Sequence, residues 1–266
     1  MHILVMTRIV PSHSLGGMQK QTMDLCSGFV ASGHQVTLLT TGRKDGVEQE
    51  NYNGVNIIFL SGSKPGYYSR KWNSMCRKKI VEIHQNSPID VIHSQSMGAN
   101  GVLKWAKKNS VPIVSTWHGT SLTEIPTFFA SASYHPRYWH WLFIMPTTML
   151  MRYFTMDLAV RKASRKITLV SPTLEKNMKF LAKDKVITIP NGIELPKVVA
   201  KPSTKPIECI AIGRMEKEKG IHYAITAIAN LPPKLQRCVL LNVVGEGTYL
   251  KDLKKLAAKL LSLIHI

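Results

Sequence analysis

Short apolar runs alternate along the first part of the chain with longer stretches in which apolar residues recur at helical spacing. The runs predict strands at residues 3–6, 36–41, 55–60, 91–93, 112–116, 167–171 and 186–190. Most are apolar throughout, which is typical of strands covered on both faces. Helical spacing predicts helices at 18–32, 74–85 and 100–108. This strand–helix order predicts an α/β fold with a doubly wound parallel sheet.

The pattern begins again after a stretch in which proline and lysine cluster. Pro196, Pro202 and Pro206 predict a linker at 196–206. Strands follow at 207–212 and 239–244, with helices at 220–230 and 249–261. We therefore expect a first domain over 1–195 and a second over 207–266. The second has two strands and about 60 residues, whereas a doubly wound domain needs roughly 100, so we expect it to be incomplete.

The apolar run at 260–266 has no helix-ending residue. We interpret it as the end of a chain that is cut short, and an ordinary terminal helix is the alternative.

Composition limits the classes of function. The chain has 266 residues, of which 44% are hydrophobic, and a net charge of +19. Such a charge favours polyanionic partners. The basic residues are scattered and no nucleic-acid recognition motif is present, so we expect no nucleic-acid partner. The four cysteines form no close pair and are expected to be reduced thiols. No signal peptide or span of ~20 apolar residues is seen, which predicts a cytoplasmic protein, either free or peripheral on the inner membrane face.

Two motifs in the first domain suggest a binding site. Gly16 and Gly17 follow the first strand and open a helix, where exposed backbone N–H groups attract an anion. A tight turn is the alternative. His118, before Gly119, ends a parallel strand, and ligands of such sheets bind beyond the strands' carboxyl ends. The alternative is a core or capping histidine. His93 ends the preceding strand and is a weaker candidate.

The most specific motif lies in the second domain, between a predicted strand and a predicted helix. Gly213 and Arg214 open this segment, and Lys219 precedes the glycine at the helix start. Two cations and several free N–H groups around one anion would form a diphosphate site. The alternative is a solvated run of charges, because lysine and glutamate alternate here.

Two further turns follow strands. Asn191, followed by Gly192, is a turn signal, and the alternative is a simple turn leaving the first domain. Gly245, Glu246 and Gly247 resemble a glycine turn that lets a nucleotide lie against the backbone, and a tight turn explains them equally well.

Taken in order, these motifs resemble the retaining GT-B glycosyltransferases of family 4, the group 1 glycosyltransferases. The resemblance covers essentially the whole chain. It implies two Rossmann-like domains, the first on the acceptor side and the second on the donor side. It also implies an NDP-sugar donor and retention of the anomeric configuration. The acceptor would be lipid-linked or a growing polysaccharide.

The resemblance also implies roles for single residues. Gly16 and Gly17 match the glycine loop near the donor phosphates and the acceptor. His118 matches the histidine beside the donor sugar, to which transition-state stabilisation is assigned. Arg214 and Lys219 match the pair that neutralises the leaving nucleoside diphosphate. No Asp-x-Asp occurs in the chain, so we expect no metal and no cofactor.

One departure from the family affects activity. The family carries a Glu-x7-Glu segment that holds the donor sugar and ribose, and nothing after Gly247 supplies it. We therefore expect the 266-residue chain alone to be inactive or nearly so. Two alternatives stay open: a non-catalytic truncated homologue, and a GT-B synthase that uses a free sugar phosphate.

Two segments suggest contact with a membrane or an acceptor. Residues 67–72 interleave aromatic and basic side chains and lead into three further cations, which suits an anionic membrane face. A solvated helix with a packed aromatic is the alternative. Residues 128–154 are rich in aromatic residues and methionine, and we expect them to form an acceptor-side wall or a lipid-facing loop.

Overall fold

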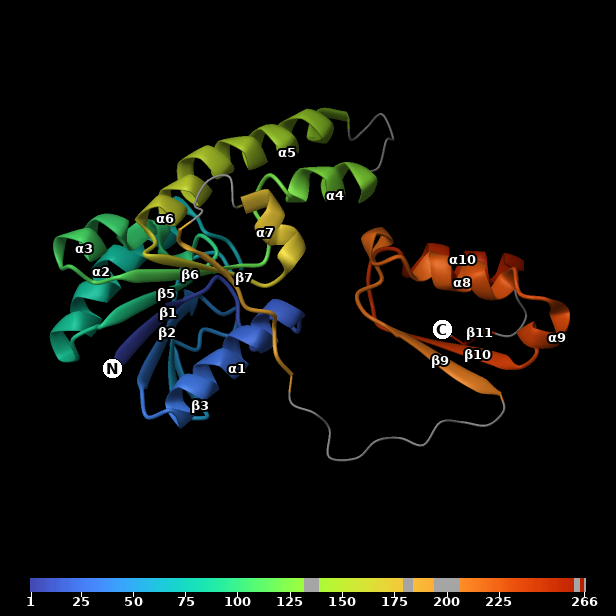
Figure 1. Cartoon of the computed structure of the whole chain (residues 1–266), viewed down its shortest axis with the longest axis horizontal. Coiled ribbons are helices and arrows are strands. Elements are labelled where there is room, and N and C mark those ends of the chain that lie inside the picture. The colour runs from blue at the N-terminus through green and yellow to red at the C-terminus, as the bar shows by residue number, and fades with distance from the viewer. Residues whose placement is uncertain (132–138, 179–183, 194–205, 261–263, 266) are drawn as a thin grey trace. The chain divides into compact units, whose positions relative to one another are not determined.

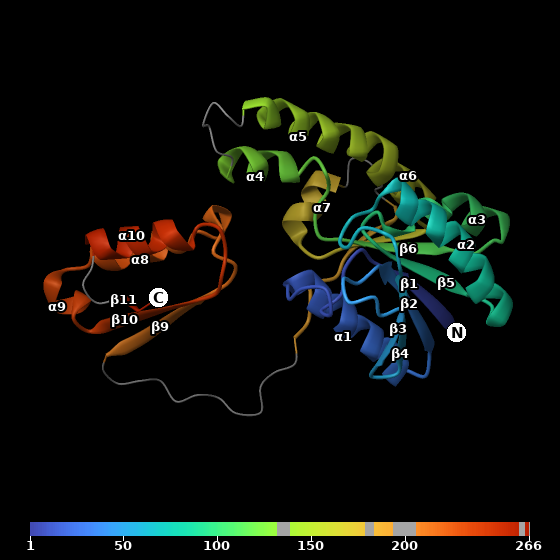
Figure 2. The same cartoon turned by 180° about the vertical axis from the view of Figure 1, so that it is seen from behind.

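The computed structural model describes residues 1–131, 139–178, 184–193, 206–260 and 264–265. The chain divides into two compact units, one formed by residues 1–125 and 140–193 and the other by residues 126–139 and 194–266. Each unit contains one sheet (Figure 1, Figure 2). The domain limits expected at 195 and 207 stay predictions, and most of the expected linker lies outside the described residues.

The larger unit is built on an eight-stranded sheet with the order β3-β4-β2-β1-β5-β6-β7-β8. All neighbouring strands are parallel except β3 and β4. The sequence pattern located every parallel strand to within about two residues at each end. The strands are β1 (His2–Met6), β2 (Gln35–Thr41), β3 (Gln49–Tyr52), β4 (Val55–Leu60), β5 (Val91–Gln95), β6 (Ile113–Trp117), β7 (Lys166–Leu169) and β8 (Val186–Thr188).

Helical segments connect these strands and account for most of the remaining chain of the larger unit. They are α1 (Gly17–Ala31), α2 (Arg70–Asn86), η1 (Gly98–Val102), α3 (Leu103–Lys108), α5 (Trp139–Arg152), η3 (Tyr153–Asp157), α6 (Leu158–Ala163) and α7 (Pro172–Met178). Helix α4 (Glu124–Ser131) begins in the larger unit, and its residues from Pro126 on are grouped with the smaller one. The predicted helix 100–108 is divided into the 3-10 segment η1 and the α-helix α3.

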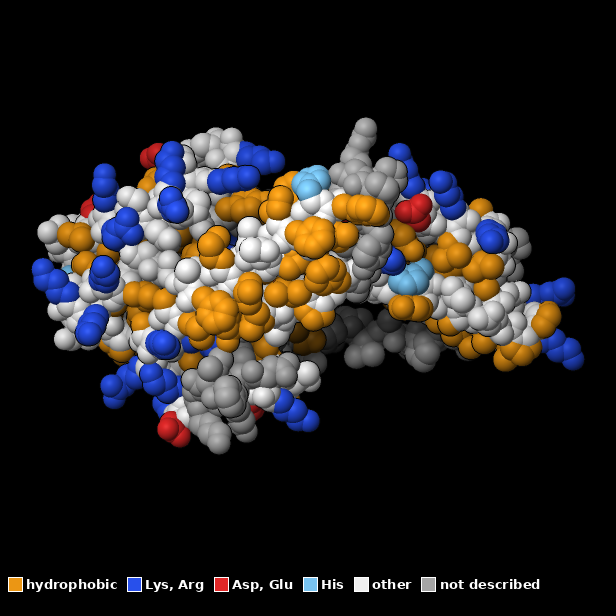
Figure 3. Space-filling model, turned by 90° about the horizontal axis from the view of Figure 1, so that it is seen from above, with side chains coloured by type: hydrophobic (Ala, Val, Ile, Leu, Met, Phe, Trp, Pro, Cys, Tyr) orange, Lys and Arg blue, Asp and Glu red, His pale blue; other side chains and the backbone are white. Residues whose placement is uncertain are grey.

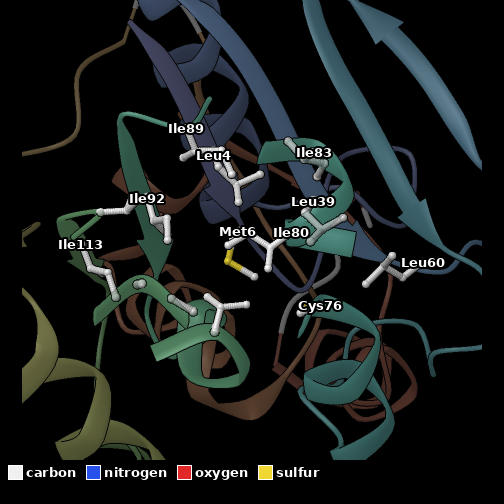
Figure 4. Close-up of a cluster of buried hydrophobic side chains, with 14 of the residues drawn as sticks. Leu4, Met6, Leu39, Leu60, Cys76, Ile80, Ile83, Ile89, Ile92 and Ile113 are labelled. Atoms are coloured by element: carbon white, nitrogen blue, oxygen red, sulfur yellow. The ribbon is translucent and has the colours of Figure 1, made fainter. Parts of the chain in front are cut away.

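Each face of the sheet is covered by its own hydrophobic layer. Leu4 and Met6 of β1 pack with residues of α2, η1 and α3 (Figure 4). Ile3 and Val5 of the same strand pack on the other side with α1. Side chains alternate across a strand, so a strand buried on both faces must be apolar at every position. The two layers confirm the predicted doubly wound sheet.

Helix α2 begins four residues earlier than predicted, and its first turn bears on the membrane contact predicted at residues 67–72. The Ser69 hydroxyl accepts a hydrogen bond from the Trp72 amide at 3.1 Å and caps the helix. Trp72 is fully buried in the core. The Tyr68 hydroxyl donates to the Gln95 carbonyl at 2.8 Å. Tyr68 and Trp72 therefore belong to the interior, which fits the alternative of a helix with a packed aromatic, whereas Tyr67 is exposed. The membrane contact of this segment stays a prediction.

The edge strand β3 was not predicted. It pairs antiparallel with β4 through a hairpin whose turn residues, Asn53 and Gly54, both have positive φ. Asn-Gly is a strong hairpin signal, but the strand itself is polar and mostly exposed. A search for apolar runs therefore does not detect β3.

The smaller unit is built on a three-stranded parallel sheet with the order β11-β10-β9. Its elements are β9 (Ile207–Ile212), η5 (Lys217–Lys219), α8 (Ile221–Ala229), α9 (Pro233–Gln236), β10 (Val239–Val244), α10 (Leu250–Leu260) and β11 (Ile264–His265). The prediction of two strands was wrong by one, because residues 264–265 pair with the free edge of β10 instead of extending a terminal helix. One compact core joins the sheet to α8 and α10.

Helix α5 is unusual in having no buried residue along its 14 residues. It nevertheless carries many large apolar side chains. Within the described part of the chain, no helix combines the length and the apolar content that crossing a bilayer requires.

Candidate functional site

In the larger unit, two neighbouring strands end side by side and bring Gln95 next to His118. Gln95 is the last residue of β5 and pairs with Thr116, and His118 follows directly after β6. The His118 Nε2 atom lies 3.2 Å from the Gln95 Oε1 atom. An amide oxygen can only accept a hydrogen bond, so Nε2 carries the hydrogen. The Nδ1 atom of a neutral imidazole is then an acceptor.

Burial lowers the pKa of His118 below its ordinary value. Burial, together with the nearby His118, lowers the pKa of His93 to about 4. His93 Nε2 lies 2.8 Å from the Thr116 hydroxyl, inside the sheet. Both histidines are therefore neutral at pH 7. His93 occupies a core position with its Nε2 in a hydrogen bond, which favours a structural role over direct contact with a ligand.

The loop after β6 is held by a buried carboxylate that the sequence did not reveal as a site residue. Asp157 is fully buried and accepts hydrogen bonds from the Ser121 amide at 2.7 Å and the Ser121 hydroxyl at 3.3 Å. Arg152 Nε donates to the same hydroxyl at 3.0 Å and pairs with Glu124 at 2.8 Å. Asp157 and Ser121 are 36 residues apart, so no local pattern in the sequence connects them. The one sequence signal for Asp157 is that no other acidic residue occurs in the 32 positions before it.

Ser121, Glu124 and Arg152 border a pocket that lies wholly within the larger unit. Arg8, Gln95, Ser96, Ser121 and Arg152 are among the residues that line it. Ser96 has a φ of 52°, a strained conformation for a residue other than glycine. Such strain at the end of a parallel strand is frequent at binding sites. The pocket therefore offers guanidinium, amide and hydroxyl groups at the edge where ligands of such sheets bind.

The two glycines after β1 behave differently. A methyl group at Gly16 would contact only the flexible end of Gln19, at 2.5 Å, whereas one at Gly17 would meet nothing within 4 Å. Gly17 is the first residue of α1, and no side chain caps this helix. Its N-terminal amides are open, as an anion site requires.

In the smaller unit, the segment between β9 and α8 carries the two predicted cations. Arg214 is 65% exposed and pairs with Glu218 at 3.3 Å. Lys219 is exposed and directly precedes Gly220, whose φ of 71° begins α8. No side chain caps the first turn of α8. A lysine and a helix start that no side chain caps thus lie together in the segment after β9.

The glycines after β10 have a packing role. A methyl group at Gly245 would lie 1.9 Å from the Gly213 carbonyl oxygen, and one at Gly247 would lie 2.4 Å from the Met215 carbonyl oxygen. The two loops are joined by hydrogen bonds from the Gly213 amide to Val244 at 3.1 Å and from the Met215 amide to Glu246 at 2.8 Å. Close contact between the loops therefore accounts for Gly245 and Gly247. A methyl group at Gly213, by contrast, would meet nothing within 4 Å.

The predicted site residues form two groups, one in each unit. His118, Gly16 and Gly17 lie in the larger unit, with His93 in the core of its sheet. Gly213, Arg214, Lys219, Gly245 and Glu246 lie in the smaller unit around the carboxyl ends of β9 and β10. Asn191 is exposed in the segment after β8.

Two family models together match most of the chain. One, described as Glycosyltransferase Family 4, matches residues 15–197, and the other, described as Glycosyl transferases group 1, matches residues 194–266. A glycogen synthase of Mycobacterium tuberculosis is 26% identical over 280 residues, covering 93% of this chain and 62% of the relative. An alpha-monoglucosyldiacylglycerol synthase of Streptococcus pneumoniae is 26% identical over 267 residues, covering 92% of this chain and 56% of the relative. The chain thus spans about three-fifths of the length of these relatives.

Among solved structures, sucrose-phosphate synthase from Thermosynechococcus elongatus is similar, with a TM-score of 0.70 and 18% identity over 99% of this chain and 69% of that one. At this identity the likeness concerns the fold, and it confirms the predicted GT-B class of two Rossmann-like units. The first family model alone covers more than half of the residues. The chain therefore belongs to the family 4, group 1 glycosyltransferases.

Proposed function

We propose that this chain takes part in moving a sugar from an NDP-sugar to an acceptor with retention of the anomeric configuration, and that it holds the donor diphosphate between β9 and α8. One observation carries the proposal. Arg214 and Lys219 bracket the segment between β9 and α8, and Lys219 lies next to an uncapped helix start. Two cations and free backbone amides match the charge and hydrogen-bonding needs of a diphosphate.

The chemistry explains why cations are useful there. Transfer breaks the bond between the sugar C1 and the diphosphate oxygen, and the bonding electron pair leaves with the diphosphate. The acceptor oxygen then bonds to C1 and loses its proton. Positive groups already in place stabilise the growing negative charge more in the transition state than in the ground state. The exposed Arg214–Glu218 pair is weak, about 0.5 kcal/mol, so Arg214 can exchange this partner for a phosphate.

We assign His118 a different role from the two cations. Its lowered pKa keeps the imidazole neutral, so it adds no positive charge at pH 7. Gln95 holds Nε2, which leaves Nδ1 to accept a hydrogen bond. A neutral, oriented acceptor suits a hydroxyl of the donor sugar better than it suits a phosphate.

The acceptor is proposed to be lipid-linked or a growing polysaccharide, reached at the inner face of a membrane. The names of the two relatives, a glycogen synthase and an alpha-monoglucosyldiacylglycerol synthase, represent these two acceptor classes. The net charge of +19 favours an anionic surface. The pocket at Arg8, Ser96 and Arg152 is the proposed place for an acceptor hydroxyl group.

We further propose that the 266-residue chain binds a nucleoside diphosphate but transfers sugar slowly, if at all. The carboxylate pair that the family uses to hold the donor sugar and ribose does not follow Gly247 in this sequence. Binding of the diphosphate needs only groups that the smaller unit already contains.

The test is isothermal titration of the chain with UDP, ADP and GDP. Arg214→Ala and Lys219→Ala are each expected to weaken binding of the preferred diphosphate by about tenfold, the value of one charge-assisted hydrogen bond. Lys217→Ala is the matched control, because it removes an exposed cation of the same 3-10 turn. His118→Ala is expected to leave diphosphate affinity unchanged.

Two results would refute the diphosphate site. One is that no nucleoside diphosphate binds to a folded chain. The other is that Lys217→Ala weakens binding as much as Lys219→Ala, which would mean that net charge alone attracts the ligand. Fast sugar transfer by the 266-residue chain would refute the proposal that it is nearly inactive alone, without affecting the diphosphate site.

A further inference from the structure

Helix α5 presents an apolar face that nothing in the described structure covers. Phe143 is 76% exposed, Met151 60% and Phe154 59%, and Ile144 and Leu150 are also exposed. Their spacing is i, i+1, i+7, i+8 and i+11, so all five lie on one side of the helical run formed by α5 and by η3, to which Phe154 belongs. The exposed Thr147 lies on the same side, and its hydroxyl donates to the Phe143 carbonyl at 2.7 Å. Scattered exposed apolar residues are normal, but a row of five on one helix face marks an interaction surface. We call this row the α5 face.

The opposite side of α5 is partly covered. Leu142, Met145 and Met149 are half-buried and lie at i, i+3 and i+7. At the carboxyl end, Arg152 is fixed by its hydrogen bond to Ser121 and its ion pair with Glu124. The helix is thus anchored to the larger unit, while the α5 face points outward.

We propose that the α5 face docks on the surface of an anionic phospholipid bilayer. Figure 3 shows a band of hydrophobic side chains over the larger unit, bordered by lysine and arginine. Residues 125–156 contain no aspartate or glutamate. An apolar surface without carboxylates, in a chain of net charge +19, complements acyl chains beneath negative headgroups.

The length of α5 and the charge of the chain indicate how the α5 face binds a bilayer. Fourteen residues of helix measure about 21 Å, whereas the hydrocarbon core of a bilayer is about 30 Å thick. The helix therefore lies in the interface and does not cross it. Trp139, which is 55% exposed and lies four residues before Phe143 on the same side of the helix, has the ring type that prefers the headgroup region. A second copy of the chain is a poorer occupant, because two molecules of charge +19 repel each other.

This inference deepens the proposed function, since a membrane would deliver a lipid-linked acceptor. Docking itself needs neither donor nor acceptor. Docking is measured without nucleotide. A failure of membrane docking would therefore leave the diphosphate site untouched, and a failure of diphosphate binding would leave membrane docking untouched.

The experiment is co-sedimentation of the 266-residue chain with vesicles of phosphatidylcholine, alone or mixed with phosphatidylglycerol. The wild-type chain is expected to prefer the anionic vesicles. The double variant Phe143→Ala/Met151→Ala is expected to bind them at least about tenfold more weakly. The control, Tyr52→Ala/Leu235→Ala, removes two similarly large exposed side chains from β3 and α9 and is expected to bind within about twofold of the wild type.

A second measurement locates the contact. Tryptophan fluorescence is expected to shift to the blue when the chain binds anionic vesicles, and Trp139→Phe is expected to reduce that shift. All variants alter exposed side chains, so unchanged thermal unfolding is the check that they fold.

Three results would overturn the proposal. The wild type fails to bind anionic vesicles. The α5 double variant binds as tightly as the wild type, which would mean that scattered cations alone are responsible. Analytical ultracentrifugation finds a stable dimer that Phe143→Ala/Met151→Ala dissociates, while vesicles do not bind, which would assign the face to a second copy.

Discussion

Replacing Gly245 with alanine is expected to unfold the loops that carry the proposed diphosphate site, whereas the same change at Gly213 is expected to be harmless to folding. Gly245 has a φ of 145°, which side chains disfavour, and its added methyl group would lie 1.9 Å from the Gly213 carbonyl oxygen. At Gly213 the added methyl group would meet nothing within 4 Å. The two glycines lie in contact with each other, so each variant controls for the other.

The magnitude follows from the contacts that must be given up. The Gly245 methyl group needs the two loops to separate by about 1 Å or more. That movement weakens the hydrogen bonds from Gly213 to Val244 and from Met215 to Glu246, each worth about 1 kcal/mol. Strain at the unfavourable φ adds roughly 1–3 kcal/mol. We expect Gly245→Ala to lower the free energy of unfolding of the smaller unit by about 2–5 kcal/mol.

The assay is native-state hydrogen exchange at the amides of β9 and β10, which reports on the smaller unit alone. Gly245→Ala is expected to speed exchange there, and Gly213→Ala to leave it unchanged while weakening nucleoside diphosphate binding by filling the open space at that position. Equal protection in Gly245→Ala and the wild type would refute the packing argument. Equal loss of protection in both variants would refute the assignment of separate roles.

Three further outcomes are expected. The unfolded state binds a proton at His93 near pH 6.5 and the folded state only near pH 4, so the free energy of unfolding should fall as the pH falls through this range. The free energy of unfolding should fall by up to about 3 kcal/mol. Urea titrations of His93→Gln should show a smaller fall over the same pH range. An equal fall in the variant would mean that other groups are responsible. Burial raises the pKa of the Cys26 thiol to about 12, so iodoacetamide should modify the half-buried Cys209 and Cys238 before Cys26, as mass spectrometry can follow; faster labelling of Cys26 would contradict its burial. Asp157→Ala leaves two donors of Ser121 without their acceptor and should cost about 2–3 kcal/mol in urea unfolding; a change below about 0.5 kcal/mol would show that the loop is held by other contacts.

The sequence was a good guide to elements buried on both faces. In β4 and β10 the apolar run has the same limits as the strand, because most of its side chains are at least partly buried under a covering layer. The run of β9 also has the limits of its strand, although Ile207, Ile210 and Ile212 are exposed. The exposed edge strand β3 lacks that signal. Helix α2 begins at Arg70, four residues before the predicted start, and Trp72 in its first turn is buried, as the alternative of a helix with a packed aromatic expected.

The sequence indicates candidate site residues only where they lie close together in the chain. Arg214 and Lys219 are visible because a local strand–turn–helix pattern contains both. The links from Gln95 to His118 and from Asp157 to Ser121 join residues 23 and 36 positions apart. They depend on which strands become neighbours in the sheet and how the loops fold over its edge. No local pattern encodes such contacts.

The account rests on the segment between β9 and α8 as the place where a nucleoside diphosphate binds. The most direct test is mapping of backbone amide chemical shifts in isotope-labelled chain during titration with UDP, ADP or GDP. The account predicts that the largest shifts occur between Gly213 and His222, including the first amides of α8. Largest shifts at Arg8, Ser96 and Arg152, with none around Lys219, would contradict it.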